Sequence, residues 1–229
     1  MGYETRFRHE LKFEVDRASY MAIRTRLMAV CDPDPHTGQN GTYLIRSIYF
    51  DTPDNRALYE KINGAGRREK FRIRYYNDSL EYIALEKKQK VNDLCKKIDC
   101  PLTKDELCDI LSGDTAFMKD HKEDLVRELY GAMTTSALRP RVLVSYTREP
   151  YVYAPGNVRV TFDSSIRTTM FSDDFTKDIF DVTATDSADM MIMEVKYDDF
   201  LPDIIKILVN DGNIRQQSFS KYEASRRYR

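Results

Sequence analysis

The feature that most constrains this chain is an alternation of charged and apolar side chains along its extended segments. Over positions 4–15 every even residue is charged, whereas the odd residues include Phe7, Leu11 and Phe13. Successive side chains of a β-strand point to opposite faces, so this segment predicts a strand with one charged and one apolar face. Such a strand must place its apolar face on a core and its charged face against water or against bound charge.

Later segments repeat this alternation. The residues that share a polar face within one segment are Lys70, Arg72 and Arg74; Glu86, Lys88 and Lys90; Tyr146 and Arg148; Arg159, Thr161 and Asp163; and Glu194 and Lys196. For a single strand, a charged face is ordinarily the solvent face of an antiparallel sheet. Because nearly every strand carries one and helices are available to cover the sheet, a closed sheet with inward charged faces explains the pattern better.

Turn residues and helical spacing divide the chain into elements around these strands. Strands are expected at 4–15, 43–50, 70–76, 82–90, 94–99, 141–148, 158–163 and 190–197, and helices at 17–30, 55–62, 103–111, 116–133, 202–209 and 220–226. Thr103 and Glu106 form a capping box for the third helix, and Pro150 and Pro155 indicate a hairpin connection. We therefore predict an α+β fold: an eight-stranded antiparallel β tunnel (a barrel) with helices packed outside, as a single domain over residues 1–229.

The charge balance limits the partners. The 36 Lys and Arg residues are offset by 37 Asp and Glu residues, which leaves a formal net charge of -1. This balance argues against a general nucleic-acid coat protein, because such proteins gain affinity from an excess of positive charge. We expect no nucleic-acid partner. A local basic cavity is still allowed, because net charge does not say where the charges lie.

Cysteine usage and hydropathy indicate the compartment. The 4 cysteines and 3 histidines lack the spacing of a structural zinc site, and the thiols are expected to be free. The N-terminal residues are polar and show no secretory signal, and no run approaches the roughly 20 apolar residues of a membrane helix. These features predict a reduced, cytoplasmic protein with no membrane segment in this chain. They leave open a membrane-bound partner and the oligomeric state.

Cations that line a tunnel are costly to bury unless counter-charges or a ligand accompany them. A linear phosphate chain supplies those charges, because Arg guanidinium and Lys ammonium groups both bind phosphoryl oxygens. Arg6, Arg8, Glu10 and Glu86 are candidate substrate contacts on these faces. Carboxylates among the cations, Glu194 included, are explained if a divalent cation accompanies the phosphates, because hard cations take carboxylate and phosphate oxygens together.

Eight short motifs follow one another along the chain. They are Arg-His-Glu-Leu-Lys-Phe (8–13), Ser-Ile-Tyr-Phe-Asp-Thr (47–52), Phe-Arg-Ile-Arg-Tyr-Tyr (71–76), Leu-Glu-Lys-Lys (85–88), Tyr-Thr-Arg (146–148), Arg-Val-Thr-Phe-Asp (159–163), Met-Glu-Val-Lys-Tyr (193–197) and Phe-Ser-Lys-Tyr (219–222). Together they resemble the catalytic domain of the vacuolar transporter chaperone (VTC) polyphosphate polymerases, within the triphosphate tunnel metalloenzyme (CYTH-like) superfamily. The resemblance spans nearly the whole chain. Each string alone is weak, but eight in order are specific.

The resemblance implies a tunnel that binds a nucleoside triphosphate with Mn²⁺ or Mg²⁺ and transfers the γ-phosphate of ATP to a growing polyphosphate chain. ATP and polyphosphate are therefore the expected partners. The residues that match the phosphate-binding cations of the family are Lys12, Arg72, Arg74, Lys88, Arg148, Arg159, Lys196 and Lys221. The residues that match further substrate contacts are Tyr146, Ser220, Lys90 and Lys97, and Glu194 matches the metal-binding glutamate.

The chain departs from the wider superfamily at one position. Members often begin with Glu-x-Glu-x-Lys, whereas the first of those positions here is Arg8. This departure disfavours a hydrolase or cyclase, in which paired glutamates hold metals, and favours the polymerase.

The sequence allows comparison of the polymerase with three alternatives. A hydrolase of tripolyphosphate or nucleoside triphosphates and a non-catalytic polyphosphate-binding module both remain open on the sequence. A tunnel for single-stranded nucleic acid is disfavoured, because such proteins stack bases on aromatic side chains in the groove. Here Phe7, Phe71 and Tyr75 fall on the face opposite the cations.

Overall fold

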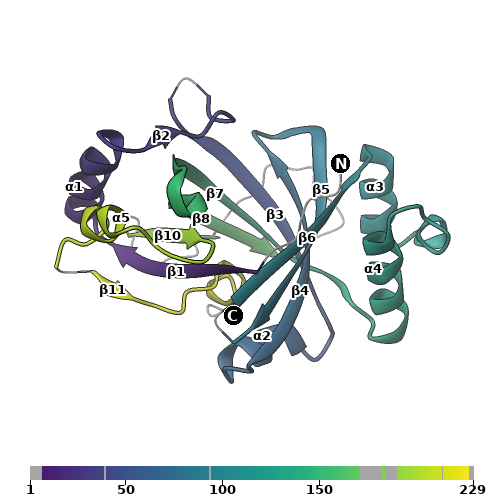
Figure 1. Cartoon of the computed structure of the whole chain (residues 1–229). Helices are drawn as coiled ribbons and strands as arrows, with labels where there is room; N and C mark the ends of the chain where they lie inside the picture. Colours follow the sequence, from purple (N-terminus) through teal and green to yellow (C-terminus); the bar gives the residue numbers. More distant parts are fainter. Residues whose placement is uncertain are drawn as a thin grey trace.

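Eight antiparallel strands form a closed ring in the computed structural model, which describes residues 7–38, 40–92, 94–170, 182–183, 190–212 and 214–226. The strands follow the order β7-β3-β4-β5-β6-β1-β10-β8, and β8 pairs back onto β7 (Figure 1). Their bounds are β1 (Arg8–Val15), β3 (Tyr43–Asp51), β4 (Arg67–Tyr76), β5 (Ser79–Val91), β6 (Leu94–Leu102), β7 (Arg139–Tyr153), β8 (Val158–Met170) and β10 (Met191–Tyr197). The predicted eight-stranded antiparallel tunnel is confirmed.

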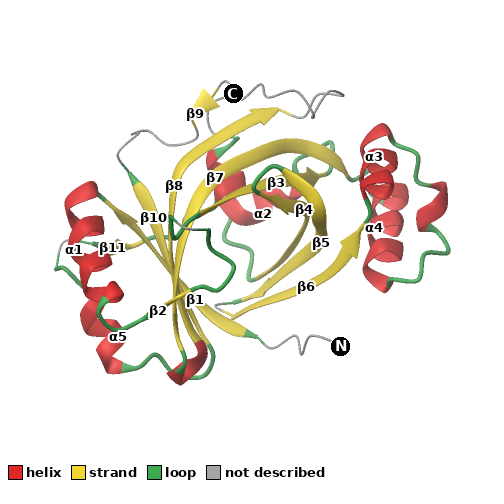
Figure 2. Cartoon of the chain, turned by 90° about the horizontal axis from the view of Figure 1, so that it is seen from above, coloured by secondary structure: helices red, strands yellow, loops and turns green. Residues whose placement is uncertain are grey.

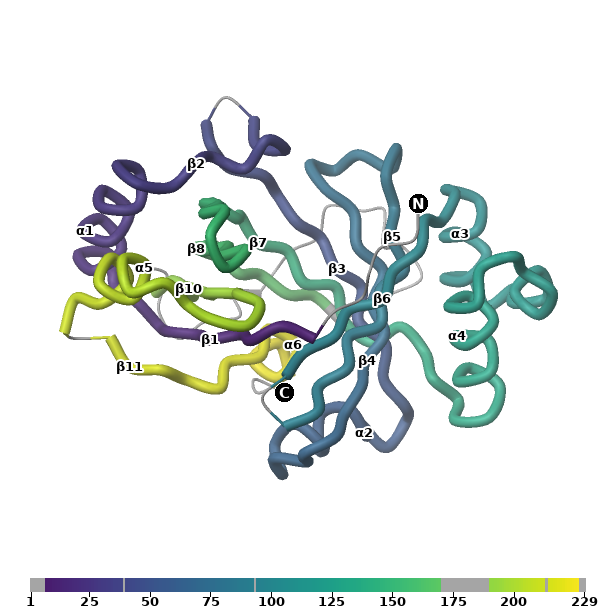
Figure 3. Tube along the Cα trace, viewed as in Figure 1, coloured from purple at the N-terminus to yellow at the C-terminus, as the bar shows by residue number. Residues whose placement is uncertain are grey.

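Three short strands extend the ring at its margins. They are β2 (Asp32–Pro33) beside β7, β9 (Val182–Thr183) beside β8, and β11 (Arg215–Gln216) beside β1. Through β11 the C-terminal part of the chain lies along the N-terminal strand, as the adjacent purple and yellow segments of Figure 3 show. The β1–β6 seam is short, because only Arg8↔Cys95 and His9↔Leu94 pair across it.

Helices pack against the outside of the ring on two opposite sides (Figure 2). The helices are α1 (Arg17–Met28), α2 (Arg56–Ile62), α3 (Lys104–Ser112), α4 (Asp124–Thr135), α5 (Asp203–Leu208) and α6 (Lys221–Ala224), with the 3-10 turns η1 (Ala116–Met118) and η2 (Pro155–Asn157). Helices α3 and α4 cover one side, and α1 and α5 cover the other. None of the helices in the described part of the chain is long and apolar enough to span a bilayer.

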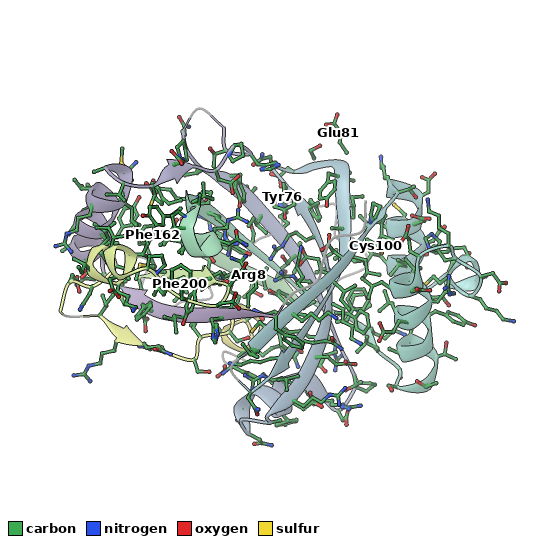
Figure 4. The ribbon with its side chains drawn as sticks, viewed as in Figure 1. Arg8, Tyr76, Glu81, Cys100, Phe162 and Phe200 are labelled. Carbon is green, nitrogen blue, oxygen red and sulfur yellow. The ribbon has the colours of Figure 1, made fainter. Side chains whose placement is uncertain are left out.

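The alternation of the strands explains these two helical layers. Outward apolar residues of β4 and β5, such as Ile73 and Leu85, pack on Leu107 of α3 and Leu129 of α4. On the other side Phe162 of β8 belongs to the cluster that includes residues of α1 and α5, and Figure 4 places Phe162 and Cys100 on these opposite sides. Each fully buried side chain of this size contributes about 1.5–3 kcal/mol through removal from water. The apolar faces of the ring therefore lie outward, which leaves the polar faces to line its interior.

The prediction of a helix over 116–133 is wrong for the first half of that range. The chain forms only the 3-10 turn η1 there, and α4 begins at Asp124. The His121 ring interrupts the helix, because Nε2 lies 2.9 Å from Glu106 Oε1 while Nδ1 accepts the Glu123 N–H. These side-chain contacts replace helical hydrogen bonds at this point.

The hairpin after the expected strand 141–148 begins later than predicted, since β7 continues through Pro150 to Tyr153. Proline lacks a backbone N–H and is tolerated in a strand only where no partner needs that donor. On one side of β7, pairing with β3 ends at Arg148 and pairing with β2 starts at Tyr151. Pro150 falls in the gap between these two partners, which explains why the strand survives it.

The short helix α6 differs from the other helices because it is buried at the inner side of the ring. Asp51 holds it in place. Its Oδ1 accepts the N–H groups of Thr52 and Ala57, its Oδ2 accepts that of Leu58, and the Tyr222 hydroxyl of α6 donates to Oδ2 as well. Asp51 therefore caps α2 and also anchors α6.

A substitution at Gly156, in the turn between β7 and β8, can test the packing at one end of the ring. Gly156 has φ +71°, and an added Cβ would lie 2.7 Å from the Phe200 carbonyl oxygen. We expect Gly156→Ala to lower the free energy of unfolding by about 2 kcal/mol or more, from positive-φ strain together with this clash. Urea denaturation measures the change.

Gly113→Ala is the matched control. Gly113 has φ +89°, but no described atom lies within 4 Å of the added Cβ, so only the strain of about 1 kcal/mol is expected. Equal losses in the two variants would contradict the close approach of the Phe200 carbonyl.

Candidate active site

Contacts between strands that are not neighbours in the ring show that its charged faces turn inward. Arg74 Nη2 of β4 donates to the Tyr146 hydroxyl of β7 at 3.1 Å, although β3 lies between these strands. Lys88 Nζ of β5 lies 2.5 Å from Glu10 Oε2 of β1, across the intervening β6. The polar side chains of the alternating strands therefore meet inside the ring.

Glu86 is the centre of one group of interior charges. Its Oε2 lies 2.5 Å from Arg72 Nη2, and its Oε1 lies 3.7 Å from Arg74 Nη1 and 3.4 Å from Lys97 Nζ. Burial alone would raise the pKa of Glu86, but these three cations outweigh burial and hold the pKa far below its usual value. The carboxylate stays ionised and keeps the two arginines of β4 oriented into the tunnel.

Glu10 and Glu194 form a second group, on the neighbouring strands β1 and β10. Lys12 Nζ lies 3.5 Å from Glu10 and 4.0 Å from Glu194, and Lys196 Nζ lies 2.7 Å from Glu194. Burial and the charge of Glu194 both act to raise the pKa of Glu10, but Lys12, Lys88 and Lys196 outweigh them and lower it to about 2. Two ionised carboxylates thus share one patch of the wall with three lysines.

Asp163 joins the strands to the C-terminal helix. Arg148 donates to both of its carboxylate oxygens at 2.7 Å, and Lys221 Nζ lies 2.5 Å from Oδ2. Lys221 Nζ also lies 4.6 Å from the centre of the Tyr146 ring, so a cation–π contact adds to the ion pair. Burial opposes ionisation of Asp163, but Arg148 and Lys221 lower its pKa to about 2. The sequence placed Asp163 on the polar face without a role in the site.

A cavity of about 660 Å³ opens beside these groups, next to the short β1–β6 seam. Its wall includes Arg68, Lys70 and Lys90, which we call the cavity cations. We call the cations that pair with Glu86, Glu10, Glu194 or Asp163 the deeper cations. Unlike them, the three cavity cations have no carboxylate within ion-pair distance among the described residues. Within the described ranges, the one hydrogen bond that Arg68 donates goes to the Ala65 carbonyl, at 3.2 Å. Positive charge is therefore least compensated here, at the end of β4 and β5 that faces the cavity.

Lys70 is the most deeply placed of the cavity cations. Its Nζ lies 3.4 Å from Ser220 Oγ and 5.6 Å from the centre of the Tyr49 ring. Burial lowers the pKa of Lys70 to about 7; Tyr49 opposes this effect, whereas Lys88 and Lys12 add to it. For Tyr49 burial acts to raise the pKa, but nearby cations led by Arg72 outweigh it and bring the pKa to about 7.

The structure brings most of the predicted site residues together. Those on the inner face or at its two ends are Lys12, Arg72, Arg74, Lys88, Arg148, Arg159, Lys196, Lys221, Glu10, Glu86, Lys97, Tyr146, Ser220 and Glu194. Arg8 lies at one margin and pairs with Asp198 at 2.7 Å, while Lys90 lies in the cavity wall. Arg6 lies outside the described residues.

The sequence missed Lys61, Arg68, Lys70 and Tyr49 as contributors to this site. The period-two pattern places Lys70 on the polar face with Arg72 without giving it a role in the site, and the same alternation extended by two residues would have added Arg68. Lys61 lies on α2 and bonds to Ser218, a contact between distant parts of the chain that no local pattern predicts.

The donor set around Glu194 fits a divalent cation that also contacts phosphate. Within the described ranges, no group of three or more His, Cys, Asp or Glu side chains forms a complete metal site. However, the buried Glu10 Oε1 accepts no hydrogen bond from the described residues, although Lys12 Nζ lies 3.5 Å from it, and Glu10 and Glu194 lie on neighbouring strands. Two adjacent carboxylates, one of them with an oxygen that is not hydrogen-bonded, suit a hard cation whose other ligands are phosphate oxygens and water.

Comparison with known protein families identifies the chain. The family model described as the VTC domain matches residues 7–228. The chain belongs to the VTC domain family. The resemblance predicted from the eight motifs is thereby confirmed. No curated protein sequence matches this VTC domain.

Two solved structures share the fold of this VTC domain at low sequence identity. A candidate adenylate cyclase from Bacillus halodurans is 14% identical with a TM-score of 0.51, and the match covers 90% of this chain and 87% of that protein. A candidate adenylyl cyclase from Hippeastrum, described as having a dominant triphosphatase activity, is 12% identical with a TM-score of 0.51, over 96% and 95% of the two chains.

Replacing Lys70 with an uncharged residue is expected to stabilise the folded protein, whereas removal of a buried residue usually destabilises it. The lowered pKa means that the unfolded chain holds this proton more tightly, so a protonated Lys70 destabilises the fold. We expect Lys70→Met to raise the free energy of unfolding by about 1–2 kcal/mol at pH 6, below the full value of the shift because of partial solvent screening. The gain should shrink as the pH rises above about 7, where folded wild-type protein loses the proton.

Lys221→Met is the control, and urea denaturation at pH 6 and pH 9 measures both variants. Lys221 pairs with Asp163 and its pKa is raised despite burial, so its removal should lower stability at both pH values. A loss of stability in Lys70→Met at pH 6 would show that Lys70 has a counter-charge.

Proposed function

We propose that this VTC domain transfers the γ-phosphate of ATP to a growing polyphosphate chain inside the ring. The observation that carries the proposal is the cavity of about 660 Å³ lined by Arg68, Lys70 and Lys90. The deeper cations already have carboxylate partners and form one anion site, whereas the cavity cations supply uncompensated charge for a second anion. A transferase needs both a donor and an acceptor site, and a polyphosphate acceptor is itself a polyanion.

The donor triphosphate would contact the interior cations. Arg72 and Arg74, two residues apart on β4, can hold successive phosphoryl groups with their planar guanidinium groups. Glu86 keeps both arginines in place before substrate arrives, so little reorganisation is needed when phosphate binds.

The acceptor's terminal phosphate is the nucleophile in this proposal. One of its oxygens forms a bond to the γ-phosphorus, the bond from that phosphorus to the β–γ bridging oxygen breaks, and ADP leaves. Lys12 and Lys196 would neutralise the charge that develops on the leaving oxygen. Because the incoming oxygen belongs to the acceptor, the protein does not have to form a covalent bond with the substrate. It has to position the two phosphate groups and neutralise their charge.

Glu194 and Glu10 would hold Mn²⁺ or Mg²⁺ in this proposal. Bound there, the metal would neutralise phosphate oxygens and orient them. The identity of the metal, like the transfer itself, belongs to the proposal.

A hydrolase of tripolyphosphate or nucleoside triphosphates is the second candidate. The triphosphatase activity described for the Hippeastrum protein favours it, since the two proteins share a fold. In a hydrolase the acceptor is water, which gains nothing from three unpaired cations in the cavity. The cavity cations are thus the feature that separates the two candidates.

Incubation with γ-labelled ATP and Mn²⁺, followed by a gel that resolves polyphosphate chains, tests the proposal. Wild-type protein should form a series of long labelled chains. Arg72→Ala and Glu194→Gln should each reduce the product at least about 100-fold, since the first removes a cation that would contact phosphate and the second a carboxylate that would hold the metal. Arg17→Ala, on the exposed side of α1, is the control and should match wild type.

The outcomes of that assay separate the candidates. Release of orthophosphate without chains would establish the hydrolase instead. Tight polyphosphate binding without either product would indicate a binding module.

The cavity cations make a separate prediction about product length. Arg68→Ala combined with Lys90→Ala should shorten the chains and raise the KM for a polyphosphate primer about tenfold, while the KM for ATP changes little. Arg67→Ala combined with Lys96→Ala removes the same charge from the outward face of β4 and β6 and serves as the control. Equal effects in the two double variants would show that the cavity has no special role.

A further inference from the structure

A row of three tyrosines crosses β3, β4 and β5 at one end of the ring. The ring centres of Tyr43 and Tyr76 are 5.7 Å apart, and those of Tyr76 and Tyr82 are 6.2 Å apart. Figure 4 places Tyr76 in the space between β3 and β5. Exposure increases along this tyrosine row, from 7% at Tyr43 to 54% at Tyr82. The row therefore leads from the interior to solvent.

The tyrosine row lies on the same face of the sheet as the phosphate-binding candidates. Tyr76 shares the alternation of Arg72 and Arg74 on β4, and Tyr82 shares that of Glu86 on β5. Tyr43 and the half-buried Tyr76 both belong to the apolar cluster inside the ring. This placement differs from that of Phe71 and other aromatic residues on the outer face.

The inner end of the row contacts the tunnel cations directly. Arg159 Nη2 donates to the Tyr43 hydroxyl at 2.6 Å, and Tyr43 pairs with Arg148 in the register of β3 and β7. Burial raises the pKa of Tyr43 although Arg159 and Arg148 oppose it, so the phenol stays neutral and can accept from Arg159. Aromatic surface therefore begins where the interior cations end.

The tyrosine row and the cavity lie at opposite ends of the same two strands. On β4 the chain runs from Arg68, in the cavity wall, to Tyr76 in the row. On β5 it runs in the other direction, from Tyr82 to Lys90. The interior cations Arg72 and Arg74 lie between the two ends. A molecule with a flat apolar group and a chain of phosphates would match this order.

We propose that Tyr76 and Tyr82 form a stacking platform for the base of a nucleoside triphosphate whose phosphates occupy the interior cations. This inference rests on the proposed function and adds to it a binding site for the base of the donor, which that function leaves unassigned. Every nucleobase offers a π-face to an aromatic side chain, so the platform tolerates different bases. Tyr82 contributes the exposed surface, and Tyr43 fixes the inner end of the row through Arg159.

The test compares binding of three ligands: ATP, ribose 5′-triphosphate and inorganic tripolyphosphate. In Tyr82→Ala the Kd for ATP should rise about tenfold, the size expected for loss of one base–aromatic stack. The Kd for ribose 5′-triphosphate and tripolyphosphate should stay at the wild-type value, because neither has a base. Tyr82→Phe should retain ATP affinity. Titration calorimetry measures all of these without turnover.

Tyr59→Ala is the matched control, because Tyr59 has a similar exposure of 53% but lies on α2 outside the tyrosine row. Its affinities should equal those of wild type. An unchanged ATP affinity in Tyr82→Ala, or an equal loss for all three ligands, would overturn the platform and leave the proposed function standing. Wild-type protein that binds none of the three ligands would overturn both.

Discussion

Buried positive charge is the constraint on which this structure depends. A set of Arg and Lys side chains inside a closed sheet cannot be desolvated without counter-charges, since unpaired buried ions cost several kcal/mol each. Glu86, Glu10 with Glu194, and Asp163 each hold two or more cations at ion-pair distance. These carboxylates allow the cationic interior to exist before a ligand arrives, and they fix the directions in which the cations point.

The closed ring follows from the same constraint. An open sheet would leave the charged faces in water, where they would need no carboxylates. Closure turns them inward and leaves the apolar faces outward, where α3 and α4 cover one side and α1 and α5 the other. The architecture and the candidate site therefore have one origin, the period-two alternation of the strands.

Much of this organisation follows from local sequence patterns. Alternation predicts the ring strands and their inward residues, and the capping box of Thr103 and Glu106 forms as expected. The errors arise where contacts between distant residues determine where a helix or a strand begins or ends. The ring of His121 contacts Glu106 and α4 begins only after it, at Asp124, and Pro150 stays in a strand because two partner strands leave a gap beside it.

The candidate site shows the same division. The interior cations were predictable from alternation and motif, but the distinction between paired and unpaired cations was not, because it depends on which strands face each other across the ring. Lys70 and Arg72 are alike in sequence, yet only Arg72 meets a carboxylate among the described residues. Tyr82 and Tyr59 are likewise alike in exposure and differ only in their neighbours.

The link between Asp51 and Tyr222 has a consequence for the order of events during synthesis. These residues are 171 positions apart, and their contact seats the helix that carries Lys221. Contacts between such distant residues form slowly, because a long loop must close before they are made. A growing chain that has emerged only as far as β10 therefore has all eight strands of the ring but lacks Ser220 and Lys221. The strands of the ring can therefore pair before the helix that supplies Lys221 to Asp163 is seated.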